Sequence, residues 1–254
     1  MNYLSIATIA RGESPYLIEW IRYHLGVGID HIYVYDNKEP GSYDYHWAQV
    51  AYREQVSFIQ FPGETMQTKM TEHALANLRN ATRWLAFIDV DEFIVPRTTD
   101  DIQTFLKDYE QYPALCIHWR LFGSSGNLHY EARPVIERFT KRAAEVDRHV
   151  KSIVDPKRTG RWVTVHKYTH GSECAVDEHR NPIEERESRP LPATADLIQL
   201  NHYVTKSYDE CCERRGRLRA DIPEKHKMPE FFHAHDKNEV EDLRALELWR
   251  KYGK

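Results

Sequence analysis

The alternation of short apolar runs with amphipathic stretches constrains the fold of this chain more than any other feature. Four apolar runs with the length and composition of strands lie at residues 3–10, 31–37, 56–62 and 84–95. After the first run, Ser14 is a suitable N-cap, Pro15 suits the first turn, and an apolar stripe continues until Gly26. Strand, helix and strand in succession predict parallel strands joined by right-handed crossovers, and therefore a doubly wound α/β sheet with helices on both faces.

The pattern changes near the middle of the chain and divides it into two halves. Further helices are predicted at residues 66–82, 100–112, 208–219 and 238–252. A strand predicted at residues 114–122 completes a regular first half, 1–122. In residues 123–254 the periodicity is weak, because Gly, Ser, Arg, His and Pro are frequent there. We read this second half as a less regular part built onto the first.

Composition excludes several classes of function. A chain of 254 residues with 41% hydrophobic content can bury a core, but its net charge of −4 provides no broad basic field for nucleic acid. Four cysteines without CxxC spacing are a poor disulfide framework, which favours a reducing, cytoplasmic location. No stretch approaches the length that spans a bilayer, so we expect peripheral membrane contact at most.

Acidic side chains cluster within the apolar run at residues 84–95. Asp89, Asp91 and Glu92 lie within four residues and would repel one another unless a cation lay among them. In an extended chain Asp89 and Asp91 project to the same side, and their hard oxygen ligands suit Mg²⁺ or Mn²⁺. A solvated turn after a strand is the alternative, but the strand before the motif and the apolar residues after it favour a metal–diphosphate site.

A family resemblance joins these features. Segments in a characteristic order span residues 10–210: ARGESPYLIEWIRYHLGVGIDHIYVYDN, WLAFIDVDEFIVP, WRLFGSSG, KSIVDP and LNHYVTKSYDE. The chain thereby resembles glycosyltransferase family 92 and related family-2-like transferases. The resemblance implies a GT-A fold, an inverting mechanism and a nucleotide-sugar donor, often a uridine diphosphate (UDP) sugar with manganese. Residues 1–122 would then bind the nucleotide sugar, and residues 123–254 would bind the acceptor and close the site.

The resemblance also implies roles for residues at the predicted strand ends. Arg11 and Glu13, next to Ala10, would lie near the nucleoside, and Asp36 would contact the base. In the acidic motif, Asp89 would face the ribose or the metal, Val90 would line the donor site, and Asp91 would ligate the metal as part of the catalytic centre.

A late segment of the chain supplies further candidates. His202 follows an apolar run and resembles the late histidine that completes the metal site of several GT-A enzymes, although a buried core histidine is the alternative. Lys206 would neutralise the leaving diphosphate, and Ser207 with Glu210 forms a predicted capping box for the next helix. His166 is a secondary candidate for the metal or donor site.

Inverting transfer also requires a base that deprotonates the acceptor hydroxyl. Glu131 is our candidate because it follows the Gly- and Ser-rich loop at residues 122–126, which would let an acceptor approach closely. A surface glutamate remains the alternative interpretation. Four arginines at residues 214–219 are typical of a solvated helix face, but they would also suit contact with anionic lipid.

The combined hypothesis is a metal-dependent hexosyltransferase that uses a nucleotide-diphosphate sugar and a carbohydrate acceptor, which could be lipid-linked. Such an enzyme would act in surface polysaccharide or lipooligosaccharide synthesis, in the cytoplasm or at the inner face of the membrane. A catalytically silent nucleotide-sugar-binding scaffold is an alternative, and so is a nucleotidyltransferase. The latter normally needs a Gly-rich phosphate loop after the first strand, which residues 10–13 do not provide.

Overall fold

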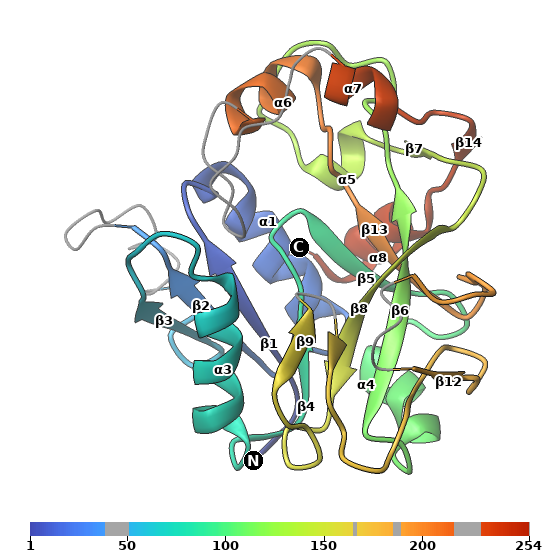
Figure 1. Ribbon diagram of the computed structural model, residues 1–254. Coiled ribbons are helices and arrows are strands. Elements are labelled where there is room, and N and C mark those ends of the chain that lie inside the picture. Colours follow the sequence, from blue (N-terminus) through green and yellow to red (C-terminus); the bar gives the residue numbers. More distant parts are fainter. Residues whose placement is uncertain (39–50, 165–166, 185–188, 216–229, 254) are drawn as a thin grey trace.

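The computed structural model describes residues 1–38, 51–164, 167–184, 189–215 and 230–253 (Figure 1). Its strands are β1 (Asn2–Ala10), β2 (His31–Asp36), β3 (Val56–Gln60), β4 (Thr82–Phe87), β5 (Glu92–Pro96), β6 (Ala114–Leu121), β7 (Lys141–Arg142), β8 (Asp147–Val154), β9 (Trp162–Thr164), β10 (Lys167–Tyr168), β11 (Ala175–Val176), β12 (Pro182–Ile183), β13 (Ile198–His202) and β14 (Val240–Glu241). Its helices are α1 (Ser14–Gly26), α3 (Gln67–Leu78), α4 (Ile102–Leu106), the 3₁₀ turn η1 (Lys107–Tyr109), α5 (Val135–Arg138), α6 (Tyr208–Arg215), α7 (Glu230–His235) and α8 (Arg244–Tyr252).

A central sheet runs through the molecule in the order β12-β11-β6-β8-β4-β1-β2-β3. The section β4-β1-β2-β3 is entirely parallel, as the alternating pattern predicts. Strand β8 lies antiparallel between β4 and β6, and β13 pairs with both β5 and β6 (Figure 1). The predicted α/β class is confirmed, and the sheet becomes mixed where strands of the second half join it.

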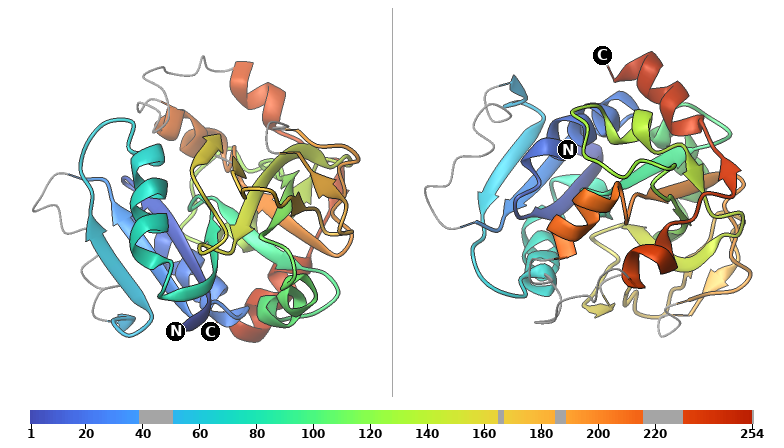
Figure 2. Two further views of the ribbon diagram at one scale, coloured as in Figure 1. Left: turned by 60° about the horizontal axis from the view of Figure 1, so that its bottom comes forward. Right: turned by 90° about the horizontal axis from the view of Figure 1, so that it is seen from above.

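Apolar side chains cover both faces of the sheet. On one face, Leu17, Trp20 and Ile21 of α1 recur at the spacing of a helical stripe and are fully buried with α4 and α8 in the larger core cluster. On the other face, α3 packs Met70 and Leu75 against the parallel strands (Figure 2). This two-layer burial holds the strand ends in place, and the strand ends carry the polar residues of interest.

The apolar run at residues 84–95 is two strands, which corrects the prediction of one. β4 ends at Phe87, a tight turn follows in which the Glu92 amide donates to the Asp89 carbonyl at 2.9 Å, and β5 then leaves to pair with β13. The chain is therefore not extended at Asp89 and Asp91, so the predicted projection of both side chains to one side does not follow from strand geometry. In a turn the two side chains are free to diverge, and they contact different partners.

Smaller corrections concern helix ends. The N-cap of α1 is Glu13 and not Ser14, which is already the first helical residue. The helix predicted at residues 100–112 is the short α4 followed by the 3₁₀ turn η1, and the one predicted at 238–252 begins only at Arg244, after the short strand β14. Among the described residues, no helix combines the length and apolarity that crossing a membrane requires.

The packing of α1 gives a direct test of the fold. Leu17→Ala removes a fully buried side chain, so we expect it to lower the free energy of unfolding by about 2–5 kcal/mol through lost burial and a residual cavity. Urea denaturation measures this change. Ile18→Ala on the same helix is the control, because Ile18 is only partly buried and its loss should cost less. Equal losses in the two variants would contradict the packing described for α1.

Candidate functional site

The carboxyl ends of the parallel strands bring the predicted nucleotide-binding residues together. Ala10, the last residue of β1, pairs in register with Asp36, the last residue of β2. Asp36 is buried and accepts hydrogen bonds from the Gln60 side chain at 3.0 Å and the Lys38 amide at 3.2 Å. This edge of the sheet therefore presents a positioned carboxylate beside the first strand end, where ligands of open α/β sheets bind.

Asp89, whose side chain is 35% exposed, forms an ion pair with a buried lysine from the second half of the chain. The Lys151 ammonium on β8 lies 2.8 Å from Asp89 Oδ2 and 3.5 Å from Glu92 Oε2. Burial opposes charge on Lys151, but the two carboxylates outweigh it and raise the pKa of this lysine. Gln67, at the start of α3, donates to Asp89 Oδ1 at 3.3 Å. Asp89 is thus held from both sides.

Asp91 faces a different set of partners. Its Oδ2 lies 3.3 Å from His202 Nε2 at the end of β13 and contacts the Arg214 guanidinium of α6. Burial works against the charged carboxylate, yet Arg214 and His202 outweigh it and hold the pKa of Asp91 well below its usual range. Asp91 Oδ1 and His202 Nδ1 are buried without a hydrogen-bond partner among the described residues. A bound water or ion would satisfy such atoms.

A small pocket adjoins Asp91. It is lined by the following residues: Gly12, Glu13, Pro15, Tyr16, Thr205, Lys206, Glu210, Glu213 and Arg214. Lys206 is buried there with a left-handed backbone (φ 53°), and its ammonium lies 4.4 Å from the centre of the Tyr16 ring. Burial lowers the pKa of Lys206, and the nearby Arg214 lowers it further. Two cationic side chains, Lys206 and Arg214, therefore share this pocket with the carboxylates of Glu13, Glu210 and Glu213.

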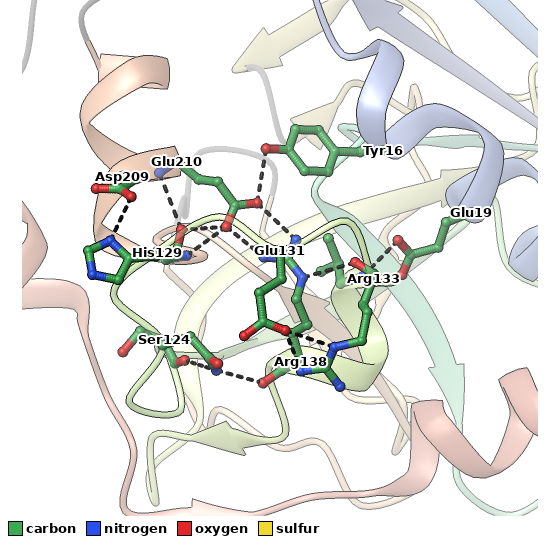
Figure 3. A network of polar contacts seen from close by, with 12 residues as sticks. Tyr16, Glu19, Ser124, His129, Glu131, Arg133, Arg138, Asp209 and Glu210 are labelled. Carbon is green, nitrogen blue, oxygen red and sulfur yellow. Dashed lines mark hydrogen bonds and ion pairs between the residues drawn. The ribbon is translucent and has the colours of Figure 1, made fainter.

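A hydrogen-bond network fixes the wall of this pocket (Figure 3). The Glu210 carboxylate of α6 accepts hydrogen bonds from two guanidinium nitrogens of Arg138, at 2.7 and 2.9 Å, and from the Tyr16 hydroxyl at 3.0 Å. Its backbone amide donates a hydrogen bond to Ser207 Oγ at 3.3 Å, and its carboxylate accepts one from the Ser207 amide at 3.2 Å. The predicted capping box is confirmed. Because Glu210 ties α6 to α1 and α5, it also sets the position of Arg214.

The remaining predicted residues lie around this core or outside it. Arg11 is exposed, and Glu13 caps α1 while lining the pocket. Glu131 is half-exposed and pairs with Arg133 at 2.7 Å, so its described contact is with a neighbour in its own loop and not with the acidic turn (Figure 3). Its role as a base stays a prediction.

The arginine run needs one correction. Arg214 does not lie on a solvated face, because it turns inward to Asp91. His166, Arg217 and Arg219 fall outside the described residues, as does the side chain of Arg215.

Comparison with known proteins gives this geometry a context. The sequence model of glycosyltransferase family 92 matches residues 4–226. The chain belongs to glycosyltransferase family 92. Family 92 proteins from Oryza sativa subsp. japonica and Ricinus communis are 29% identical to it over 157 and 159 residues, which is 60% and 61% of this chain. These matches cover 27% and 29% of the two relatives, so most of each relative's length lies outside the match.

Solved structures with partial similarity include TarS from S. aureus. The structure of TarS 1-349 has a TM-score of 0.44 and 12% identity over 80% of this chain and 61% of TarS. The same TarS segment in complex with UDP has a TM-score of 0.38 and 15% identity over 51% of this chain and 38% of that one.

Two site residues of this family 92 protein escaped sequence reasoning. Lys151 stands in the KSIVDP segment, and a lysine close before Ile153 and Val154 was a signal, since a lysine buried with them needs a carboxylate partner. Arg214 gave no such signal, because neighbouring arginines on a short helix usually face solvent. Only the docking of α6 turns it toward Asp91.

Glu19, in the same region, provides a pH test of this family 92 structure. Its buried carboxylate accepts the amides of Val135 and Ile136 at 2.8 and 2.9 Å, and burial raises its pKa from 4.5 to about 7 (Figure 3). Between these values the unfolded chain releases a proton that the folded chain retains, so this group lowers stability as pH rises from 4.5 to 7.

We therefore predict a pH-dependent difference between the wild type and Glu19→Gln. The variant does not titrate at this position. The free energy of unfolding of the wild type minus that of Glu19→Gln should therefore fall by about 3 kcal/mol between pH 4 and pH 8. Urea denaturation of both proteins across this range measures it. A difference that stays constant with pH would show that folding leaves the pKa of Glu19 unchanged.

Proposed function

We propose that this chain transfers a hexose from a nucleotide-diphosphate sugar, with a UDP sugar as the preferred donor, to a carbohydrate acceptor by an inverting displacement. The observation that carries the proposal is the Asp91–His202 pair. Asp91 Oδ1 and His202 Nδ1 are buried without hydrogen-bond partners among the described residues, and Lys206 and Arg214 line the pocket beside them. Membership of glycosyltransferase family 92 supports this reading. Acceptors in surface polysaccharide or lipooligosaccharide synthesis at the cytoplasmic face of the membrane are part of the proposal.

We propose that a divalent cation binds at Asp91 and His202, where it would compete with Arg214 for the Asp91 carboxylate. A carboxylate and an imidazole, each with an unpartnered buried atom, provide the donor types that Mn²⁺ or Mg²⁺ accepts. Asp91 and His202 would hold the ion, and Asp89, now held by Lys151 and Gln67, is proposed as a further ligand or as the ribose contact. When bound, the ion neutralises negative charge on the diphosphate as the glycosidic bond breaks.

The protein's own residues then have separable tasks. Asp36 and Ala10 lie at adjacent strand ends and would position the nucleoside, with Arg11 and Glu13 beside them. Lys206 and Arg214 would hold the diphosphate, and their positive charge stabilises the leaving group more strongly as its negative charge grows. A side chain on the acceptor side must take the hydroxyl proton, and Glu131 is the sequence-derived candidate.

Nucleotide binding tests this proposal. UDP with MnCl₂ should raise the melting temperature, because a ligand selective for the native state adds stability with the logarithm of its saturation.

Asp91→Asn should abolish this shift and reduce UDP release from UDP-glucose, UDP-galactose or UDP-N-acetylglucosamine by a hundred-fold or more, that is roughly 3 kcal/mol of transition-state stabilisation. Asp108→Asn, at an exposed carboxylate, is the control. If Asp91→Asn binds UDP independently of manganese and turns over normally, the metal assignment is refuted. If the wild type binds UDP without turnover, the result supports a catalytically silent scaffold protein.

Arg214 gives a second prediction, because it contacts the carboxylate proposed to bind the metal. Arg214→Gln removes a competing cation from Asp91, so we expect the variant to bind Mn²⁺ alone several-fold more tightly. The same change removes a diphosphate contact, so UDP affinity at saturating Mn²⁺ should fall about 10- to 100-fold. Electron paramagnetic resonance of free Mn²⁺ and calorimetry with UDP measure the two effects, with the exposed Arg250→Gln as control. Unchanged Mn²⁺ affinity would show that Arg214 does not compete for Asp91.

A further inference from the structure

A second cluster of titratable side chains lies at the same edge of the sheet, outside the donor pocket. Asp147 begins β8, and its Oδ1 lies 2.7 Å from His149 Nδ1 and accepts the His149 amide at 2.9 Å. On the other side of the imidazole ring, Arg189 Nε lies 3.1 Å from His149 Nε2. Both members of the Asp147–His149 pair are 26% exposed, so a solute can reach them.

The partners of His149 define its protonation pattern. A guanidinium can only donate hydrogen bonds, so His149 Nε2 must accept from Arg189 and carries a lone pair. His149 Nδ1 then carries the proton and donates it to Asp147. Burial works to raise the pKa of Asp147, but the hydrogen bonds from His149 outweigh it and lower that pKa, which keeps the carboxylate ionised. An imidazole backed by a carboxylate, with a lone pair on its second nitrogen, has the arrangement of a general base.

The Asp147–His149 pair lies close to the proposed donor site. The Trp119 ring stacks on His149 with ring centres 4.9 Å apart and meets His202 with ring centres 4.3 Å apart. One aromatic side chain of β6 therefore separates His149 from the Asp91–His202 pair. The β6–β8 ladder shifts register here, from His118–Val150 to Trp119–Asp147, and such irregularities re-aim side chains near functional sites. Strands β6, β8 and β13 meet at this edge (Figure 1).

We propose that His149, oriented by Asp147, is the base that accepts the proton of the acceptor hydroxyl, and that Trp119 forms the adjoining wall of the acceptor site. This inference rests on the proposed glycosyl transfer. Glu131 fits the task less well, because its side chain is 48% exposed and paired with Arg133 in its own loop. Arg189 is exposed and holds His149 Nε2 in the empty protein, so the acceptor hydroxyl takes its place.

The proposed step balances without a further reactant. The acceptor oxygen forms a bond to the anomeric carbon of the sugar as the bond from that carbon to the diphosphate oxygen breaks. The electron pair of the broken bond leaves with the nucleoside diphosphate. The hydroxyl proton moves to His149 Nε2, and the ionised Asp147 stabilises the imidazolium that forms. Water in place of the acceptor gives donor hydrolysis by the same step.

UDP release from the three UDP sugars named above, in MnCl₂, tests the base with water or with free hexoses as acceptors. His149→Gln should lower kcat for UDP release about 10²- to 10⁴-fold and leave the Kd for UDP within about twofold of wild type. Asp147→Asn should also lower kcat, because its amide disrupts the tautomer of His149. Added imidazole should partly restore UDP release in His149→Ala. His129→Gln is a matched control, because His129 forms a similar pair with Asp209 at 3.0 Å on the surface.

The outcomes separate this inference from the proposed function. Wild-type kcat in His149→Gln, with UDP binding intact, would overturn the base assignment and leave the donor site standing. Loss of UDP affinity in His149→Gln would also overturn it, because the pair would then support the donor site and not the acceptor. Absence of UDP binding or of UDP release in the wild type would refute the proposed transfer itself, and the base assignment with it.

Discussion

The need to balance buried carboxylates with cations organises this edge of the molecule. Asp89, Asp91 and Glu92 lie in or beside one tight turn, where burial would disfavour their charges if no cation were near. Lys151 arrives on β8 and Arg214 on α6, both from the second half of the chain. The acidic turn of the first half therefore depends on folding of the second half around it.

That dependence explains why β8 is inserted between β4 and β6. By pairing with both, it carries Lys151 to the acidic turn, and Asp147 with His149 to the place where we propose that the acceptor binds. The network around Glu210 has a similar role on the opposite wall. Because Arg138 and Glu210 are both almost fully buried and paired through two hydrogen bonds, their separation would leave an uncompensated charge. The position of α6, and with it Arg214, is thereby defined.

The sequence anticipated features that local physics controls. The spacing of apolar residues, together with composition, predicted the parallel strands β1, β2 and β3 and the helix α1. A strand or helix that buries one apolar face needs this spacing whichever elements pack against it. The same pattern placed Ala10 and Asp36 at the carboxyl ends of β1 and β2, which the structure confirms, whereas their part in ligand binding stays a prediction. The capping box at Ser207 was also readable, since it involves only residues three positions apart.

Errors arose where distant segments decide the outcome. The acidic residues at 89–92 left a turn open as an alternative, but only the pairing of β5 with β13, far along the chain, decides that the chain turns between β4 and β5. Helix ends such as Glu13 and Arg244 shifted by a few residues for similar reasons. A buried lysine, by contrast, carried a usable signal, although not the identity of its partner.

By itself, the sequence determined the α/β class, the strand ends at which polar residues gather, and the family to which the chain belongs. Only the tertiary structure decided which charges meet: Lys151 with Asp89, Arg214 and His202 with Asp91, and His149 with Asp147 beside Trp119. The physical reason is the distance along the chain over which each interaction acts. Periodicity and capping act over a few residues along the chain, whereas the pairing of a buried charge depends on strand order and helix docking, which join residues as far apart in sequence as Asp91 and Arg214.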